Sequence, residues 1–217
     1  QIVANNIDIT GVGDDGLDID DPAGSATNAA LSFTNLTIAD SGDAGITLSG
    51  LGANSSTEFV NTSVSNSGTG GLRVSDLGTD ATMAFTNLDI DESAGNGIQL
   101  SDNSGTFVFD ADSSLQGSGE VAFLVQGGDS DVRYSGTIDH TGADGFEMIE
   151  LDSTLAGSNI VFDSEAADAL VDTNLGIYVH GSAGNLSVVA DTELSGIDGV
   201  FINNSSGDYA FTNTHLT

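Results

Sequence analysis

The stretch Phe85-Thr-Asn-Leu-Asp-Ile-Asp-Glu-Ser-Ala-Gly-Asn-Gly-Ile-Gln-Leu100 decides the fold, because the rest of the chain reads as imperfect copies of it. Its opening Phe is followed two residues later by Asn87, and Gly97 begins the closing Gly-Ile-Gln-Leu. The same spacing of residue types starts again at Phe33 and at Phe59. Self-similarity with a period of roughly 20 to 50 residues indicates a stack of structural repeats.

Each copy contains three short segments in which apolar and polar residues alternate, as they do in half-buried β-strands. The first segment ends on Phe, Tyr or Val and covers residues 31–33, 57–59, 83–85, 107–109, 132–134, 160–162, 187–189 and 209–211. The second is a short aliphatic segment. The third covers residues 17–19, 46–48, 72–74, 98–100, 123–125, 146–148, 177–179 and 200–202. Because alternate residues of a strand face opposite sides, the middle residues of the third segment are predicted to point outward: Asp18, Thr47, Arg73, Gln99, Leu124, Glu147, Tyr178 and Phe201.

The spacing of these segments favours a solenoid over a helical repeat. Successive third segments lie 29, 26, 26, 25, 23, 31 and 23 residues apart, and no stretch shows the 3.6-residue pattern of a surface helix. Three strands and three turns of variable length fit one coil, in which each strand pairs with its own copy about 4.8 Å along the rod. Parallel crossovers are right-handed in nearly all proteins. The sequence therefore predicts an all-β, right-handed parallel β-helix with three sheets and about eight coils, with residues 1–217 as a single domain.

A recurring Asn marks the corner between the first and second segments. Asn tolerates the left-handed backbone conformation that a tight corner requires, and its side-chain amide can hydrogen-bond to the next Asn in the stack. Ala111, Gly136 and Ser164 interrupt the series of Asn residues in the middle coils. Weaker stacking is expected there. The members of the series are Asn6, Asn35, Asn61, Asn87 and Asn213, with Asp191 in place of one Asn.

The charge of the chain limits its partners. The net charge is −31, and Arg73 and Arg133 are the only basic side chains apart from three histidines. Such a surface repels phosphates, so nucleic-acid binding is not expected, and anionic membranes are disfavoured for the same reason. No apolar run reaches the length of a membrane-spanning helix, so membrane insertion is not expected either.

The strand–Asn–strand corner and the Gly-Ile-x-Leu segment give the chain a resemblance to the right-handed parallel β-helix superfamily typified by pectate lyases. In character the chain is similar to the repeat segments of autotransporter passengers and large bacterial surface adhesins. The resemblance covers nearly the whole chain and is specific for the fold. It implies an extracellular location at a cell surface and a place within a longer repeat protein. It also implies that enzymes of this fold hold their active cleft along the Gly-Ile-x-Leu sheet.

The outward residues of that sheet do not form a convincing catalytic set. An enzyme of this fold acting on acidic glycans is expected to combine carboxylates with a basic side chain, and the sole candidate here is Arg73. Its predicted neighbours, Thr47 and Gln99, make a poor acid–base pair, so Arg73 is expected to be a lone solvated side chain. We therefore expect a non-catalytic structural or adhesive module whose partner is a glycan or surface receptor. A polysaccharide lyase or glycoside hydrolase is the alternative.

An acidic cluster in the first coil is the candidate metal site. Several carboxylates enter, face out of and leave one strand, and hard cations such as Ca²⁺ accept convergent carboxylate oxygens. A calcium-rigidified spacer is thus a second alternative, and mutually repelling, solvated turn residues are an equally good interpretation. The predicted ligands are Asp14, Asp15, Asp18, Asp20 and Asp21.

Two further expectations concern the histidines and the chain ends. His140, His180 and His215 fall in different coils and are expected to be surface residues rather than metal ligands. Neither terminus shows the polar cap that solenoids need. Further coils of the same long chain, or end-to-end self-association of copies, are therefore expected.

Overall fold

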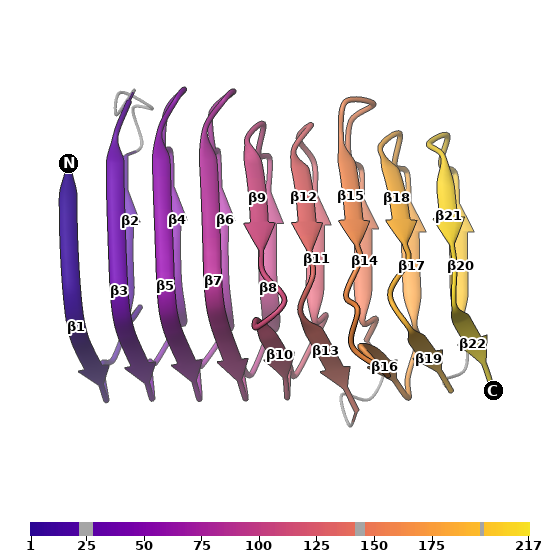
Figure 1. The fold of residues 1–217 in the computed structure, drawn as a ribbon, viewed down its shortest axis with the longest axis horizontal. Helices are drawn as coiled ribbons and strands as arrows, with labels where there is room; N and C mark the ends of the chain where they lie inside the picture. Colours follow the sequence, from indigo (N-terminus) through magenta and orange to yellow (C-terminus); the bar gives the residue numbers. More distant parts are fainter. Residues whose placement is uncertain (22–27, 142–145, 196–197) are drawn as a thin grey trace.

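The structure, a computed structural model, describes residues 1–21, 28–141, 146–195 and 198–217. Figure 1 shows a rod of parallel strands with the N-terminus at one end and the C-terminus at the other. The regular structure within the described residues is entirely β-strand. Those residues accordingly include no helix of the length and apolarity needed to cross a membrane. The all-β parallel solenoid predicted from the sequence is confirmed.

One sheet consists of the third strand of each coil. It has eight parallel strands, each of which pairs with the equivalent strand of the neighbouring coil. These strands are β2 (Leu17–Asp20), β4 (Ala44–Ser49), β6 (Gly70–Ser75), β8 (Asn96–Ser101), β11 (Phe123–Gln126), β14 (Ile149–Asp152), β17 (Ile177–His180) and β20 (Val200–Asn203).

The other sheet has fourteen strands among the described residues and bends around the Asn corner, so two of the three predicted sheets form one continuous sheet. In the first four coils one long strand forms both faces: β1 (Ile2–Thr10), β3 (Ala30–Ala39), β5 (Ser56–Ser65) and β7 (Thr82–Asp91). In later coils the two faces have separate strands: β9 (Thr106–Phe109) and β10 (Ser114–Gln116), β12 (Asp131–Tyr134) and β13 (Thr137–His140), β15 (Asn159–Phe162) and β16 (Leu170–Asp172), β18 (Asn185–Val188) and β19 (Thr192–Leu194), and β21 (Tyr209–Phe211) and β22 (Thr214–Leu216).

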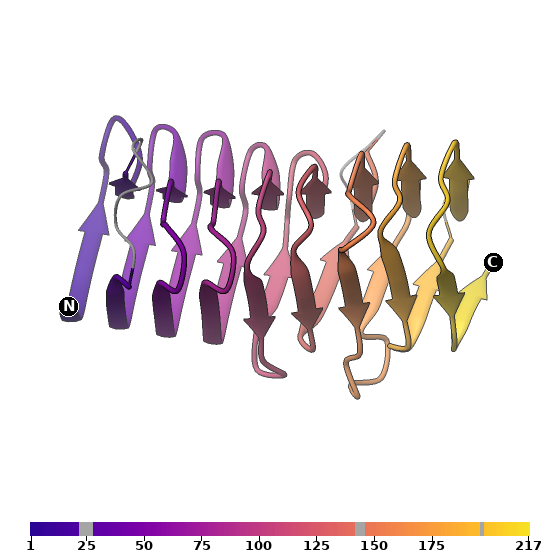
Figure 2. The ribbon, with the colours of Figure 1, turned by 90° about the horizontal axis from the view of Figure 1, so that it is seen from above.

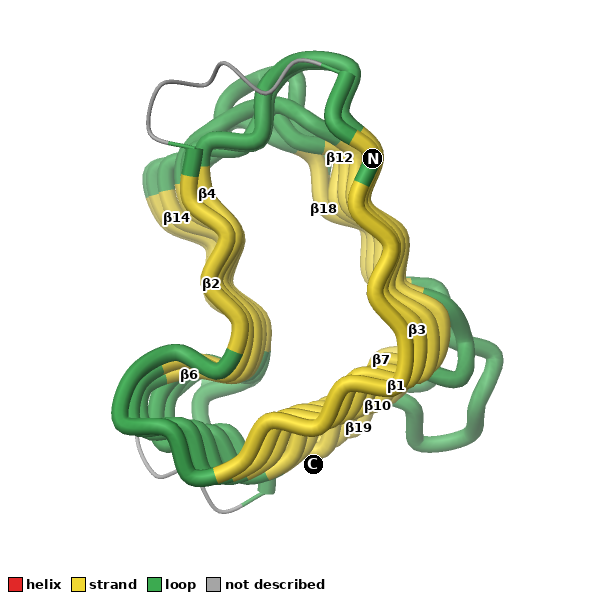
Figure 3. The backbone as a smooth tube through the Cα atoms, turned by 90° about the vertical axis from the view of Figure 1, so that its left-hand side faces the viewer, coloured by secondary structure: helices red, strands yellow, loops and turns green. Residues whose placement is uncertain are grey.

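The view along the rod shows the three faces and the handedness. Seen from the N-terminal end, the chain passes clockwise from β1 through β2 to β3 while it recedes from the viewer (Figure 3). A coil that advances in this sense is right-handed, as predicted. The view from above shows the same strands repeated from coil to coil along the rod (Figure 2).

The Asn corner explains why the long strands stay continuous. The corner residues Asn6, Asn35, Asn61 and Asn87 have φ angles of 55°, 54°, 53° and 56°, in the left-handed region that Asn tolerates. Each Nδ2 donates to the Oδ1 of the previous Asn, at 2.8, 3.1 and 3.2 Å along the series. In the fifth coil the ladder ends on Asp110, whose carboxylate accepts the backbone N–H of Asn87 at 2.9 Å. The ladder predicted for the first four coils and its interruption are thus confirmed, and the strands divide where the ladder stops. The predicted pair at the C-terminal end is different, because Asn213 Nδ2 donates to the carbonyl oxygen of Val189 at 3.3 Å rather than to Asp191.

The core is a column of stacked side chains. The rings of Phe33, Phe59, Phe85 and Phe109 lie over one another, with successive centroids 4.9, 5.1 and 4.6 Å apart. The column continues through Tyr134, whose buried hydroxyl donates to the carbonyl oxygen of Thr137 at 2.8 Å. Burial, followed by the charges of Asp89 and Asp110, raises the pKa of this Tyr134 hydroxyl. Each buried ring stabilises the fold by about 1.5–3 kcal/mol.

Two register predictions were wrong. In the sixth coil the strand is β14, in which Ile149 pairs with Phe123 and Ile177, rather than the predicted 146–148. Ile149 lies 26 residues after Phe123, close to the usual spacing, and the predicted Phe146 is 37% exposed. In the eighth coil Val188, rather than the predicted Val189, pairs with Phe162 and points inward. Both sites offer two overlapping apolar patterns, and pairing with the neighbouring coils selects between them.

Candidate functional site

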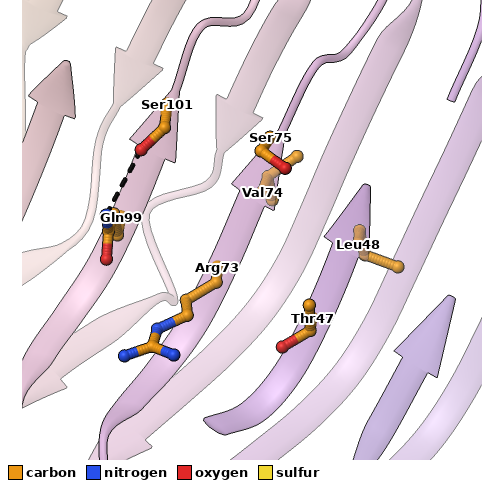
Figure 4. Close-up of a pocket in the computed structure, with 7 residues that line it drawn as sticks. All are labelled: Thr47, Leu48, Arg73, Val74, Ser75, Gln99 and Ser101. Atoms are coloured by element: carbon orange, nitrogen blue, oxygen red, sulfur yellow. Dashed lines mark hydrogen bonds between the residues drawn. The ribbon is translucent and has the colours of Figure 1, made fainter. Parts of the chain in front are cut away.

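The outer face of the eight-stranded sheet carries the polar hollow expected for a cleft on this side of the fold. Its volume is about 320 Å³, and it is lined by Thr47, Leu48, Arg73, Val74, Ser75, Gln99 and Ser101. In Figure 4 the Arg73 side chain extends between the strands that carry Thr47 and Gln99. Strand pairing places Arg73 directly between these two residues, which confirms the predicted outward column at this point. The hollow is at the small end of the range for ligand sites.

Arg73 is paired rather than solvated alone, which corrects the expectation from the sequence. Its Nη1 lies 3.5 Å from Asp43 Oδ1, and its Nη2 donates to the carbonyl oxygen of Thr69 at 3.1 Å. The neighbouring Gln99 is also engaged, because its amide contacts Asn96 and Ser101 at 3.3 Å each. The hollow therefore contains one cation, already partly neutralised, and amide or hydroxyl groups that are poor general acids and bases.

The acidic cluster of the first coil is only partly brought together. Carboxylate oxygens of Asp14, Asp15 and Asp43 lie within 4.8 Å of one another and could hold a metal ion. Asp18, Asp20 and Asp21 are not part of this group. Asp43 was not among the predicted ligands, although it follows Asp14 by the same 29 residues that separate the paired Leu17 and Ile46.

Asp43 and several other carboxylates of the cluster serve as acceptors between coils. Asp15 Oδ1 accepts the backbone N–H of Ala44 at 2.9 Å, and Asp43 accepts the Thr69 hydroxyl. Asp18 faces outward beside Thr47, while the carboxylate of Asp20 accepts the Ser49 hydroxyl. The backbone N–H of Asp21 donates to the backbone carbonyl oxygen of Ser49 at 3.0 Å. The aspartates of these turns therefore hold neighbouring coils together through hydrogen bonds, a structural role that requires no metal.

The C-terminal part of the same outer face is aromatic and acidic. The outward column runs from Leu124 through Glu150 and Tyr178 to Phe201, so Glu150 occupies the position predicted for Glu147. Tyr178 and Phe201 stack with ring centroids 5.2 Å apart and ring planes within 2°. Partial burial raises the pKa of Glu150, the negative charges of Glu147 and Asp152 raise it further, and His180 opposes them.

His140 is buried, contrary to the prediction that it lies at the surface. Its Nδ1 is 3.0 Å from Asp172 Oδ1, and both side chains are completely excluded from solvent. Its Nε2 is 2.8 Å from the carbonyl oxygen of Glu120, so this nitrogen donates. The other Asp172 oxygen accepts the backbone N–H of Gly176. The isolated sequence gave no signal for this pair, because the two residues lie 32 positions apart in coils of unequal length.

A wider hollow of about 730 Å³ lies where residues 163–169 replace the Asn corner. Its lining includes Asp163, Glu165, Asp191 and His215. His215 Nε2 lies 3.6 Å from Asp191 Oδ1, and Arg133 pairs with Asp163 at 2.8 Å. Both arginines of the chain are therefore already matched to an aspartate.

Comparison with known proteins adds no functional assignment. Searches against protein families, curated protein sequences and solved structures find no match to this chain.

Proposed function

We propose that this chain is a non-catalytic structural and adhesive module of a secreted, cell-surface protein. The rod supplies length, and its outer faces and loops supply contacts. The observation that carries the proposal is the continuous core, whose buried residues run from Leu31 in the second coil to Leu194 in the eighth. A solenoid of this kind gains stability from each stacked coil and presents an extended surface.

The outer sheet supports the non-catalytic part of the proposal. Arg73 is held by Asp43 and Thr69, and no described residue of the adjoining hollow is a carboxylic acid or histidine positioned for proton transfer. A polysaccharide lyase or hydrolase remains the competing proposal, because the hollow lies on the face where enzymes of similar fold act. Turnover of any member of a panel of acidic and neutral polysaccharides, abolished by Arg73→Gln, would replace the present proposal with the enzymatic one.

Adhesion is tested directly with beads coated with the folded protein. We expect the beads to adhere to cells or extracellular polymers more strongly than beads coated with heat-unfolded protein. Equal adhesion of the two bead preparations across a broad panel of surfaces contradicts the proposal.

Calcium rigidification is a second candidate, favoured by the approach of Asp14, Asp15 and Asp43. Under this alternative, millimolar Ca²⁺ raises the melting temperature of chelator-treated protein by mass action. Asp43→Asn then removes the shift, while Asp129→Asn in a distant turn leaves it unchanged. A melting curve unaffected by Ca²⁺ eliminates this candidate.

The proposal includes stacking at the two ends of the rod. β1 pairs only with β3, and β20, β21 and β22 each pair on one side only. Ile2, Val3 and Leu216 are 56%, 56% and 65% exposed at these edges. Open strand edges template the pairing of further strands, supplied here by coils of the same long chain or by a second copy. Sedimentation of the 217-residue chain as a stable, aggregation-resistant monomer counts against pairing between copies.

A further inference from the structure

A stacked aromatic pair, half-buried Tyr178 and exposed Phe201, lies on the outer face of the eight-stranded sheet and outside the core of the rod. Among the described residues, the ring contacts outside the core are Tyr178 with Phe201 and Tyr178 with His180, at 5.2 and 6.0 Å. Phe201 is 46% exposed and lies on β20, the last strand of the sheet, which pairs on one side only. Exposed aromatic rings cost solvation free energy in the isolated protein, and they are enriched where proteins meet partners.

Three carboxylates adjoin these rings. Strand pairing places Glu150 beside Tyr178 and Asp152 beside His180, and Glu147 lies just before the same strand. The pKa of Glu150 is raised by its partial burial and by the charges of Glu147 and Asp152, each of which repels Glu150, while His180 opposes the rise. Neither arginine relieves this repulsion, because Arg73 pairs with Asp43 and Arg133 with Asp163.

We propose that this aromatic–acidic patch binds an arginine- or lysine-bearing segment of a partner protein. The patch is defined by Glu147, Glu150, Asp152, Tyr178, His180 and Phe201. This inference rests on the proposed adhesive function and names the chemistry of the partner. It differs from the earlier hollow, because it lies four coils further along the sheet, as counted from β6 to β17, and contains carboxylates and aromatic rings instead of an arginine.

The combination of rings and carboxylates selects for a cationic side chain. A guanidinium can stack on an aromatic face and at the same time pair with a carboxylate, and its aliphatic stem covers apolar surface. A cation placed beside Glu150 also relieves the repulsion from Glu147 and Asp152, which a neutral glycan does not. The patch extends over β14, β17 and β20, about 10 Å along the rod, which matches about three residues of an extended segment.

The test is calorimetric titration with an acetylated and amidated Gly-Arg-Gly-Arg-Gly-Arg peptide at about 0.15 M NaCl, where surface attraction beyond about 8 Å is screened. Glu150→Gln and Tyr178→Ser are each expected to weaken binding about tenfold or more, as for central interface residues. Tyr178→Phe retains the ring and should retain the affinity. Glu58→Gln is the matched control, since it removes the same charge from an exposed position on β5, on the other sheet.

Three outcomes overturn the inference. Equal weakening by Glu150→Gln and Glu58→Gln indicates attraction to the overall charge alone. Unchanged binding in Tyr178→Ser shows that the rings take no part. Binding of a neutral hexasaccharide, with none of the peptide, assigns the patch to a glycan. In each of these three cases, coated beads that still adhere show that the inference has failed while the adhesive function stands.

Discussion

At the scale of single residues, packing requires the Gly that precedes the first inward aliphatic residue of the third strand in each of the first four coils. Ala122 and Met148 take its place in the next two coils. A Cβ added to Gly71 would collide with the side chain of Ile90 and with the carbonyl oxygen of Gly97, and the same relation holds for Gly45 with Val64. An aliphatic residue of the following coil, Val64 or Ile90, therefore packs directly against the backbone of the Gly. No side chain larger than hydrogen fits without displacing the buried aliphatic residue.

Gly71→Ala is accordingly expected to destabilise the protein by about 1–3 kcal/mol, the usual cost of overpacking a tight core. Gly13→Ala is the control, because nothing lies within 4 Å of a Cβ added there. Urea denaturation of the two variants measures the difference. Equal midpoints for Gly71→Ala and Gly13→Ala contradict this account of the glycine.

The buried pair of His140 and Asp172 predicts an unusual ranking of substitutions. Asp172→Ala leaves His140 Nδ1 and the Gly176 N–H without partners, and breaking such a buried pair costs about 3–5 kcal/mol. Asp172→Asn can still accept from Gly176 through its carbonyl oxygen and donate to His140 through its amide, so it should cost much less. Thermal unfolding of both variants tests this ranking, and a similar loss in the two removes the hydrogen-bond explanation.

Glu150 gives the stability of the protein a pH dependence of defined sign. Its pKa is raised above 4.5 in the folded protein, so folding disfavours the charged form. The resulting destabilisation is present at neutral pH. It disappears as the pH falls through the raised pKa of the folded protein toward the ordinary pKa of 4.5. Glu150→Gln should therefore be more stable than the parent at pH 7, and the advantage should vanish below pH 4.5. Denaturation midpoints across this range, with Glu58→Gln as the control, measure the effect.

At the scale of elements, the Asn ladder keeps β1, β3, β5 and β7 continuous around the corner. Asn61 combines a left-handed backbone with side-chain hydrogen bonds to both neighbouring coils. Asn61→Ala loses both the tolerance of the left-handed backbone and the side-chain hydrogen bonds, so it should lower the free energy of unfolding by about 2 kcal/mol. Asn61→Gly loses only the hydrogen bonds and should lower it by about half as much. Guanidinium unfolding separates the two contributions. Equal losses in both variants mean that backbone strain is not a factor at this corner.

The elements also show how far the sequence alone could predict the structure. The repeated spacing of Phe85, Asn87 and Gly97 predicted the strands, the corner and the outward column. It could do so because equivalent positions in successive coils have the same burial and backbone conformation and therefore favour the same residue types. It failed where two registers satisfy the same local pattern, as at Met148 and Ile149, or at Val188 and Val189. The repeated spacing also did not predict the approach of Asp43 to Asp14 or the burial of His140. These contacts join side chains of separate coils, and they depend on the conformation of turns whose lengths vary.

At the scale of the whole molecule, charge repulsion between coils opposes the stacking that holds the rod together. The net charge is −31, and both arginines are already paired with aspartates. Neighbouring coils are about 4.8 Å apart. Repulsion between their carboxylates therefore extends across several coils at 0.01 M salt, where the Debye length is about 30 Å.

NaCl should therefore raise the melting temperature, with most of the rise complete by about 0.15 M, where the Debye length has fallen to about 8 Å. Screening acts in this low range, whereas effects on apolar burial require higher salt concentrations. Scanning calorimetry between 0.01 and 0.5 M NaCl measures the rise, and a series in sucrose controls for surface exclusion. A melting temperature that is flat below 0.15 M and climbs only in concentrated salt indicates instead that the inter-coil hydrogen bonds of Asp15, Asp20, Asp43 and Asp89 already offset the repulsion.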